Sequence, residues 1–159
     1  MPKVLIVYYS ETGNTKEMAE LIAEGVRREK DVEVEVKAVQ DTKVEELLDF
    51  DGIVIGSPTY YGSMAAEVKK FIDNSIKFHG ELEGKVGGAF SSSGGIAGGN
   101  ETTIMDILQA LLIHGMVVQG TPNGDHYGPV AVGKPDDRSK NSCREYGHRI
   151  AKLVLKTAA

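Results

Sequence analysis

Residues 10–15, with the sequence SETGNT, have the side chains and the position to bind an anion. They contain three hydroxyl groups and a glycine, and they lie between an apolar run and a helix-like pattern. The first N–H groups of a helix have no partner within it and carry a partial positive charge, so a phosphate can bind there. We therefore expect a phosphate site, with an N-cap followed by a polar turn as the alternative.

The same segment lacks the residues of three other kinds of phosphate site. It has no Gly-Lys-Ser/Thr, which the loop of nucleotide triphosphatases requires. It has no cysteine to serve as a phosphatase nucleophile, and the preceding run does not end in the acidic residues of a phospho-accepting receiver. Charge-assisted hydrogen bonds contribute about 1.5–3 kcal/mol each, so five or six could hold a dianion without a lysine.

Two further polar segments follow predicted strands. Residues 56–63 include adjacent tyrosines that could stack on a flat ring or could only pack the loop down. Residues 91–100 are rich in serine and glycine and could expose backbone donors and acceptors, or could be a flexible connection. Ligands of open parallel sheets bind beyond the carboxyl ends of the strands. We therefore expect all three segments to contribute to one site at one edge of one sheet.

The elements that would position these segments alternate along the chain. Apolar runs predict buried strands at 4–9, 53–55, 86–90 and 116–118, and strict alternation predicts an edge strand at 32–36. Apolar stripes predict helices around 18–26, 64–72, 104–112 and 146–154, with a shorter one at 44–48. This alternation favours a parallel sheet covered on both faces. Residues 121–141 are predicted to be mostly loop, with 130–132 returning briefly to the sheet.

The composition bounds the remaining possibilities. The 159 residues suit one domain, 1–159, and a net charge of −5 disfavours nucleic acid and anionic membranes as partners. We expect no membrane insertion, because the apolar run at 4–9 is too short to span a bilayer. We expect a cytoplasmic protein, because the single cysteine, Cys143, can form no intrachain disulfide. Cys143 is interpreted as a bystander, and the histidines lack metal-ligand spacing. His114 is expected at a helix end that favours a cation, and the other three histidines at the surface or at helix ends.

These features together resemble the flavodoxin family. SETGNT is similar to the phosphate loop of flavodoxins, and the order and spacing of the elements match over essentially the whole chain. The resemblance implies an α/β, flavodoxin-like three-layer sandwich with a five-stranded parallel sheet of order 2-1-3-4-5. It implies flavin mononucleotide (FMN) as the cofactor, with the phosphate, the ring and the pyrimidine edge at the first, second and third segments. The implied cofactor-binding residues are Ser10, Glu11, Thr12, Gly13, Asn14, Thr15, Pro58, Thr59, Tyr60, Tyr61, Gly62, Ser91, Ser92, Ser93, Gly94, Gly95 and Gly98.

Two stretches also resemble a related branch, the NAD(P)H:quinone oxidoreductases similar to the tryptophan-repressor-binding protein. They are GSPTYYGSMAAEVKKFID and GGNETTIMDILQALLIHGMVV. Members of that branch usually have Arg at the position of Tyr60 and a His pair at Ile113 and His114. They also have extra segments near 41–44 and 120–127, which help to build a tetramer and are short here. These departures argue against a tetramer and against direct quinone reduction.

Three functions therefore stay open. The first is an electron carrier between a reductase and an acceptor protein, with no catalytic side chain and no metal, as a monomer or dimer. The second is an enzyme that passes hydride from NAD(P)H to a quinone through FMN. The third is a flavin-binding module without redox partners, which would exchange electrons with no reductase.

Overall fold

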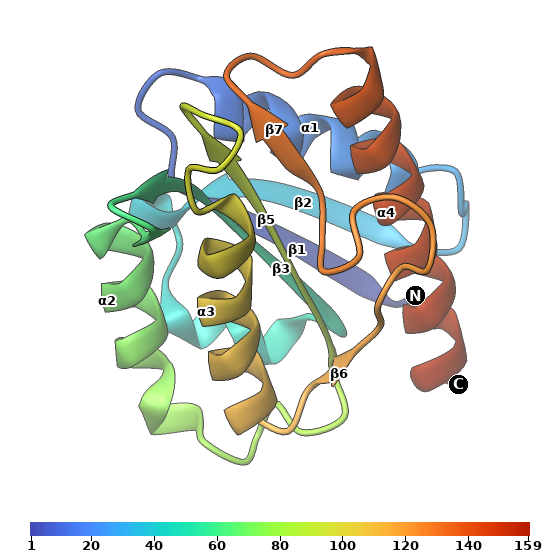
Figure 1. Ribbon diagram of the computed structural model, residues 1–159. Coiled ribbons are helices and arrows are strands. Elements are labelled where there is room, and N and C mark those ends of the chain that lie inside the picture. The colour runs from blue at the N-terminus through green and yellow to red at the C-terminus, as the bar shows by residue number, and fades with distance from the viewer.

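A parallel sheet of apolar strands forms the centre of the computed structural model, which describes residues 1–159 (Figure 1). Its strand order is β2-β1-β3-β5-β6, and all of these neighbours are parallel. Counting only these five strands, the order is the predicted 2-1-3-4-5, which is confirmed. Two short strands add to them: β4 is antiparallel to β3, and β7 is parallel to β5. The strands are β1 Lys3–Tyr8, β2 Glu33–Ala38, β3 Gly52–Tyr60, β4 Ser63–Met64, β5 Val86–Ser93, β6 Val117–Val118 and β7 Val130–Val132.

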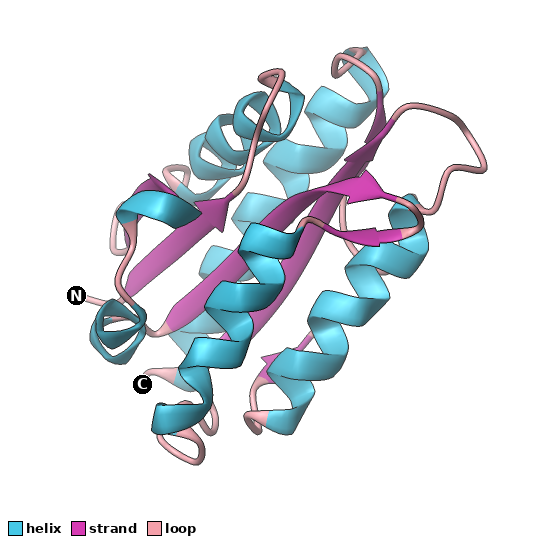
Figure 2. Ribbon diagram, turned by 90° about the vertical axis from the view of Figure 1, so that its left-hand side faces the viewer, coloured by secondary structure: helices cyan, strands magenta, loops and turns pink.

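Helices cover both faces of the sheet, which lies between them as a middle layer (Figure 2). The helices are α1 Asn14–Val26, α2 Ala66–Asn74, α3 Asn100–Ile113 and α4 Asp137–Thr157. One hydrophobic cluster joins α1 and α4 to one face, and a second joins α2 and α3 to the other. The alternating strand β2 lies at the sheet edge, as expected. No helix combines the length and the apolar character needed to cross a bilayer.

Two segments between the main elements differ in detail from their predictions. The expected helix at 44–48 is a 3-10 helix, Val44–Asp49, in which Val44 and Leu47 are both buried. Their spacing of three residues suits the three residues per turn of a 3-10 helix. The expected loop at 121–141 ends early, because α4 starts at Asp137. Asp136 caps it by accepting a hydrogen bond from the Ser139 N–H at 2.9 Å.

Helices α1 and α4 cross at two glycines with their backbones in contact. A β-carbon on Gly25 would lie 1.9 Å from the Arg144 carbonyl oxygen, and one on Gly147 would lie 1.9 Å from the Ile22 carbonyl oxygen. No side chain can fit at either point. The crossing fixes α1, and with it the segment that precedes α1, against the longest helix of the protein.

Two residues with titratable side chains are buried away from the sheet edge that carries the three polar segments. Cys143 is fully buried in α4, and burial raises the pKa of its thiol to about 12, in keeping with a bystander. His114 does end α3, but it is buried, and burial followed by the nearby His79 lowers its pKa. The expectation of a helix-end cation at His114 is therefore wrong. Its Nε2 atom lies 2.8 Å from Ser75 Oγ, which donates its own proton to the Ile72 carbonyl oxygen.

This arrangement predicts a loss of stability in acid. Ser75 Oγ already donates, so His114 Nε2 carries the proton, and the buried Nδ1 is left without a partner. Protonation of Nδ1 in the folded state is unfavourable, so the unfolded chain binds this proton first. The free energy of unfolding should therefore fall as pH drops from about 6.5 through the lowered folded pKa. Urea titrations of His114→Gln should show a weaker fall over this window, whereas the exposed-site control His126→Gln should follow the wild type. Equal slopes in all three proteins would contradict this prediction.

Candidate cofactor-binding site

The three polar segments meet where β1, β3 and β5 end, and they enclose a cavity of about 240 Å³. The second and third segments are more ordered than loops. β3 continues to Tyr60 and β5 to Ser93, because Ser57 and Pro58 pair with Ser91 and Ser92 and because β7 pairs with the end of β5. The expectation that these residues are loop is wrong, although they lie at the predicted edge. The cavity is lined by Ser10, Glu11, Thr12, Asn14, Thr15, Pro58, Thr59, Tyr60, Ser92, Ser93, Gly94 and Gly133.

The start of α1 presents unpaired hydrogen-bond donors to this cavity. Gly13 is the N-cap with φ of 102°, a left-handed conformation that glycine adopts at little cost, and no side chain caps the helix. The N–H groups of Asn14, Thr15 and Lys16 have no acceptor in the chain. The Ser10 hydroxyl oxygen accepts a bond from the Gly13 N–H at 3.1 Å, which leaves its proton free. These groups form a donor set suited to an anion.

A second hydroxyl pair joins α1 to β5. Thr15 Oγ1 and Ser92 Oγ lie 2.9 Å apart, and both residues are buried. One hydroxyl of the pair donates to the other, so one of the two protons stays available to a ligand. This bond connects the first polar segment to the third across 77 residues of sequence.

Hydroxyl groups also fix the end of β5. Ser91 Oγ lies 3.0 Å from Thr59 Oγ1 on the neighbouring strand. Ser93 Oγ donates to the Gly95 carbonyl oxygen at 2.8 Å and accepts from Asn100 Nδ2 at 2.9 Å. The three serines are therefore buried as bonded groups of the strand, and the exposed part of the segment begins at Gly94.

The carboxylate of Glu11 contacts the second polar segment, residues 56–63, which we call the ring segment. The Tyr60 hydroxyl donates to Glu11 Oε2 at 2.7 Å. Burial, and then this bond, raise the pKa of Tyr60 to about 12, so the phenol stays protonated. A carboxylate repels a phosphate, so any contribution of Glu11 to anion binding must come from its backbone. The bond links the first and second segments across the cavity.

The tip of the ring segment is a hairpin between β3 and β4. Tyr61 is fully exposed with φ of 49°, and Gly62 has φ of 81°. The Gly62 carbonyl oxygen accepts from Thr102 Oγ1 at 2.7 Å. A β-carbon on Gly99 would lie 2.8 Å from Gly62 Cα, so the hairpin touches the start of α3.

The structure brings most of the expected residues to the cavity, but not all. Gly13, Tyr61, Gly62, Ser91, Gly95 and Gly98 do not line it. Gly133, which was not expected, does line it, because β7 returns the chain to β5 and the Gly133 N–H donates to the Ser93 carbonyl oxygen at 2.8 Å. The predicted return of 130–132 to the sheet was the signal that could have identified Gly133.

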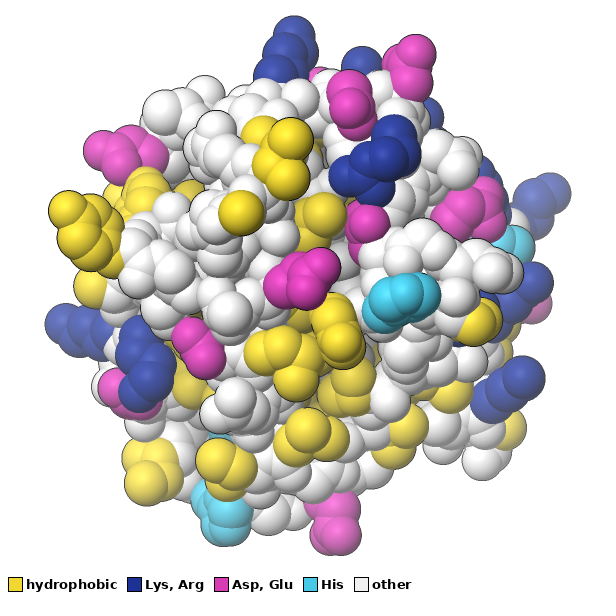
Figure 3. Space-filling view, in the orientation of Figure 1, with side chains coloured by type: hydrophobic (Ala, Val, Ile, Leu, Met, Phe, Trp, Pro, Cys, Tyr) yellow, Lys and Arg dark blue, Asp and Glu magenta, His cyan; other side chains and the backbone are white.

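Apolar side chains of the second and third polar segments are exposed, namely Tyr60, Tyr61 and Ile96. Burial, followed by the charges of Glu67 and Glu11, raises the pKa of Tyr9, which directly follows β1. Hydrophobic side chains also reach the surface among charges of both signs on the face in Figure 3.

Comparison with known proteins agrees with this geometry. The model of the flavodoxin domain matches residues 5–112. A flavodoxin of Aquifex aeolicus is 43% identical, covering 97% of this chain and 88% of the relative. An NAD(P)H dehydrogenase (quinone) of Archaeoglobus fulgidus is 33% identical, covering 98% of this chain and 99% of the relative. A solved flavodoxin from the domain Archaea superimposes with a TM-score of 0.80 at 32% identity, covering 96% of this chain and 99% of that one.

The domain match covers well over half of the chain, and the Aquifex relative matches along nearly all of it. The proteins of this family bind FMN and transfer electrons. The chain belongs to the flavodoxin family.

Proposed function

We propose that the cavity holds FMN with its phosphate at residues 10–15. The observation that carries this proposal is the donor set at the start of α1, namely three amides without acceptors and free hydroxyl protons at Ser10 and at the Thr15–Ser92 pair. A phosphate dianion can accept several such bonds, and no cationic side chain is needed. The donor set thus fits the group that the family implies.

The other two segments suit the flavin ring. Tyr60 lines the cavity and offers an aromatic face for stacking, and its bond to Glu11 holds it in place. Residues 94–98 are exposed and supply backbone donors and acceptors for the polar edge of the ring. Tyr61, which lies outside the cavity, would flank the ring only at its open side.

We further propose that the protein is a cytoplasmic carrier that passes single electrons from a reductase to an acceptor protein. Bound FMN supplies the redox chemistry, and the chain binds, orients and shields it. The exposed side chains of Tyr60, Tyr61 and Ile96 offer an apolar contact surface beside the site. The carboxylates of Glu11 and Glu67 nearby disfavour added negative charge on the ring, and so should lower its reduction potential.

The visible spectrum and the electron stoichiometry test this proposal. The purified protein should be yellow and should release FMN, identified by mass. A potentiometric titration should show two resolved one-electron steps. A colourless protein that binds no added FMN would exclude the flavin site, and one unresolved two-electron step would exclude single-electron transfer.

The quinone reductase from Archaeoglobus, with 33% identity over nearly the full length, supports a second candidate function. In that function NAD(P)H would pass hydride through FMN to a quinone. The FMN-loaded protein should then oxidise NADH in the presence of a benzoquinone much faster than free FMN does. Equal rates would eliminate this candidate.

A further inference from the structure

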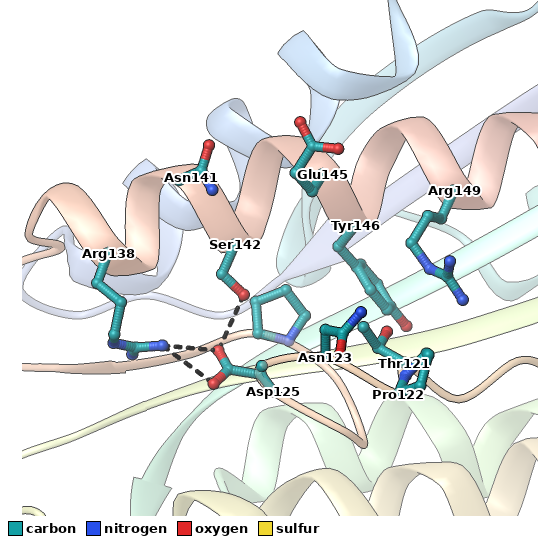
Figure 4. A pocket seen from close by; sticks show the side chains of 12 residues that line it. Thr121, Pro122, Asn123, Asp125, Arg138, Asn141, Ser142, Glu145, Tyr146 and Arg149 are labelled. Atoms are coloured by element: carbon teal, nitrogen blue, oxygen red, sulfur yellow. Dashed lines mark hydrogen bonds and ion pairs between the residues drawn. The ribbon is translucent and has the colours of Figure 1, made fainter.

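A larger cavity, of about 440 Å³, lies between residues 121–129 and helix α4 (Figure 4). It shares no lining residue with the cofactor cavity. Its lining residues are mostly polar. They come from one loop and from one side of helix α4, which face each other in Figure 4. Its volume is in the range of small-molecule sites.

Most charges at this cavity are already paired. Arg138 Nη1 contacts both carboxylate oxygens of Asp125, at 3.0 and 3.2 Å, and its Nη2 donates to the Val130 carbonyl oxygen. Glu145, which also lines the cavity, pairs with Arg28 of α1 at 2.6 Å. Each pair joins one positive and one negative side chain, so the two pairs add no net charge to the cavity.

Arg149 is the exception. Its guanidinium donates one hydrogen bond, from Nη2 to the Gly120 carbonyl oxygen at 2.9 Å, and it forms no ion pair. A guanidinium has five N–H donors, so most of those on Arg149 are free. The side chain is half-buried and extends from α4 toward Thr121 and Pro122 (Figure 4). The cavity therefore contains one uncompensated positive charge with unused donors.

Tyr146 adds a buried donor beside it. Tyr146 is only 6% exposed, and its hydroxyl oxygen accepts from the Ala89 N–H at 3.1 Å. Its own proton has no acceptor in the chain. Asn123 lines the same cavity, where its amide group can add a further hydrogen bond.

We propose that this cavity binds a small oxyanion, a phosphate or a carboxylate, through Arg149 and Tyr146. A planar guanidinium recognises both groups with two parallel hydrogen bonds. This cavity shares no lining residue with the cofactor cavity, so the proposal does not rest on the proposed redox function. Asp125 holds the opposite wall, because its carboxylate also accepts from the Ser142 hydroxyl and the Val130 N–H.

The test is an NMR titration of the full chain, loaded with FMN so that the phosphate segment at 10–15 is filled. Inorganic phosphate, AMP and succinate are added separately at constant ionic strength. At least one should give saturable shifts at the amides of residues 120–125 and 142–149, with a dissociation constant of about 1 mM or lower. Binding of phosphate alone would identify a free phosphate ion as the ligand. Tighter binding of AMP would identify a nucleotide, and binding of succinate would identify a carboxylate.

Arg149→Gln should weaken this binding roughly tenfold or more. Arg144→Gln is the matched control, since Arg144 lies on the same helix but pairs with Glu24 outside the cavity, and it should bind as the wild type does. If Arg149→Gln fails to fold, the titration of the wild-type protein still tests whether the cavity binds an oxyanion. No saturable shift with any probe, shifts mapped elsewhere, or equal loss in both variants would overturn the proposal.

Discussion

Thr15→Val should weaken FMN binding roughly 10- to 150-fold while leaving riboflavin binding nearly unchanged. Valine keeps the shape of threonine but removes the hydroxyl that is paired with Ser92 at 2.9 Å. The proton that this pair offers to a phosphate is then lost or misplaced. One charge-assisted hydrogen bond contributes about 1.5–3 kcal/mol, which corresponds to this change in affinity. Quenching of flavin fluorescence by the cofactor-free protein measures both ligands directly.

Riboflavin makes the result specific to the phosphate, because it has the ring but not the charged group. Glu20→Gln, an exposed position on the same helix, serves as the control and should bind both flavins as the wild type does. A parallel loss of riboflavin affinity in Thr15→Val would mean that the hydroxyl acts on the shape of the site. It would not then be a phosphate donor.

Gly147→Ala should lower the melting temperature, against the usual trend for helices. Alanine within a helix normally stabilises by about 1 kcal/mol relative to glycine. Here the added carbon would lie 1.9 Å from the Ile22 carbonyl oxygen, and a backbone oxygen cannot move aside as a side chain can. Forcing the helices apart should cost about 1–3 kcal/mol net, or roughly 3–10 °C in a protein of this size.

Gly25→Ala should have a similar effect, because its carbon would meet the Arg144 carbonyl oxygen at the same distance. Lys152→Ala, at an exposed position of α4, is the control and should change stability by less than about 0.5 kcal/mol. Thermal melts of the three variants measure the difference. Unchanged or raised melting temperatures in both glycine variants would show that α1 and α4 do not touch in solution.

The sheet could be predicted from the sequence because its strands are encoded by local patterns. The apolar run at 4–9 and the alternation at 32–36 each reflect how many faces of the strand are buried, so the central and the edge strand were both identified. The strand extensions at 57–60 and 91–93 were missed, since the serines and Pro58 give no strand signal and interrupt the apolar pattern. They are held in the sheet by partners on β3, β5 and β7 that are distant in sequence.

The site was predictable to the extent that it depends on chain order. Residues 10–15 precede α1 in sequence, and the structure places donors there as expected. The bond between Glu11 and Tyr60, and the position of Gly133 on the cavity wall, depend on contacts between residues at least 40 positions apart. Local patterns contain no information about such contacts. The burial of His114 was missed for the same reason, because Ser75 comes from the neighbouring helical segment.

The glycine contact between α1 and α4 also has a kinetic consequence. Helix α1, whose first turn would hold the phosphate, packs backbone to backbone on α4 near its other end, at Ile22 and Gly25, so the helix can hardly shift as a body. The opposite wall is a hairpin held by two residue pairs, with an exposed tip at Tyr61. Dissociation of a nucleotide should therefore begin with its aromatic end, when the hairpin opens, and the charged end should leave last.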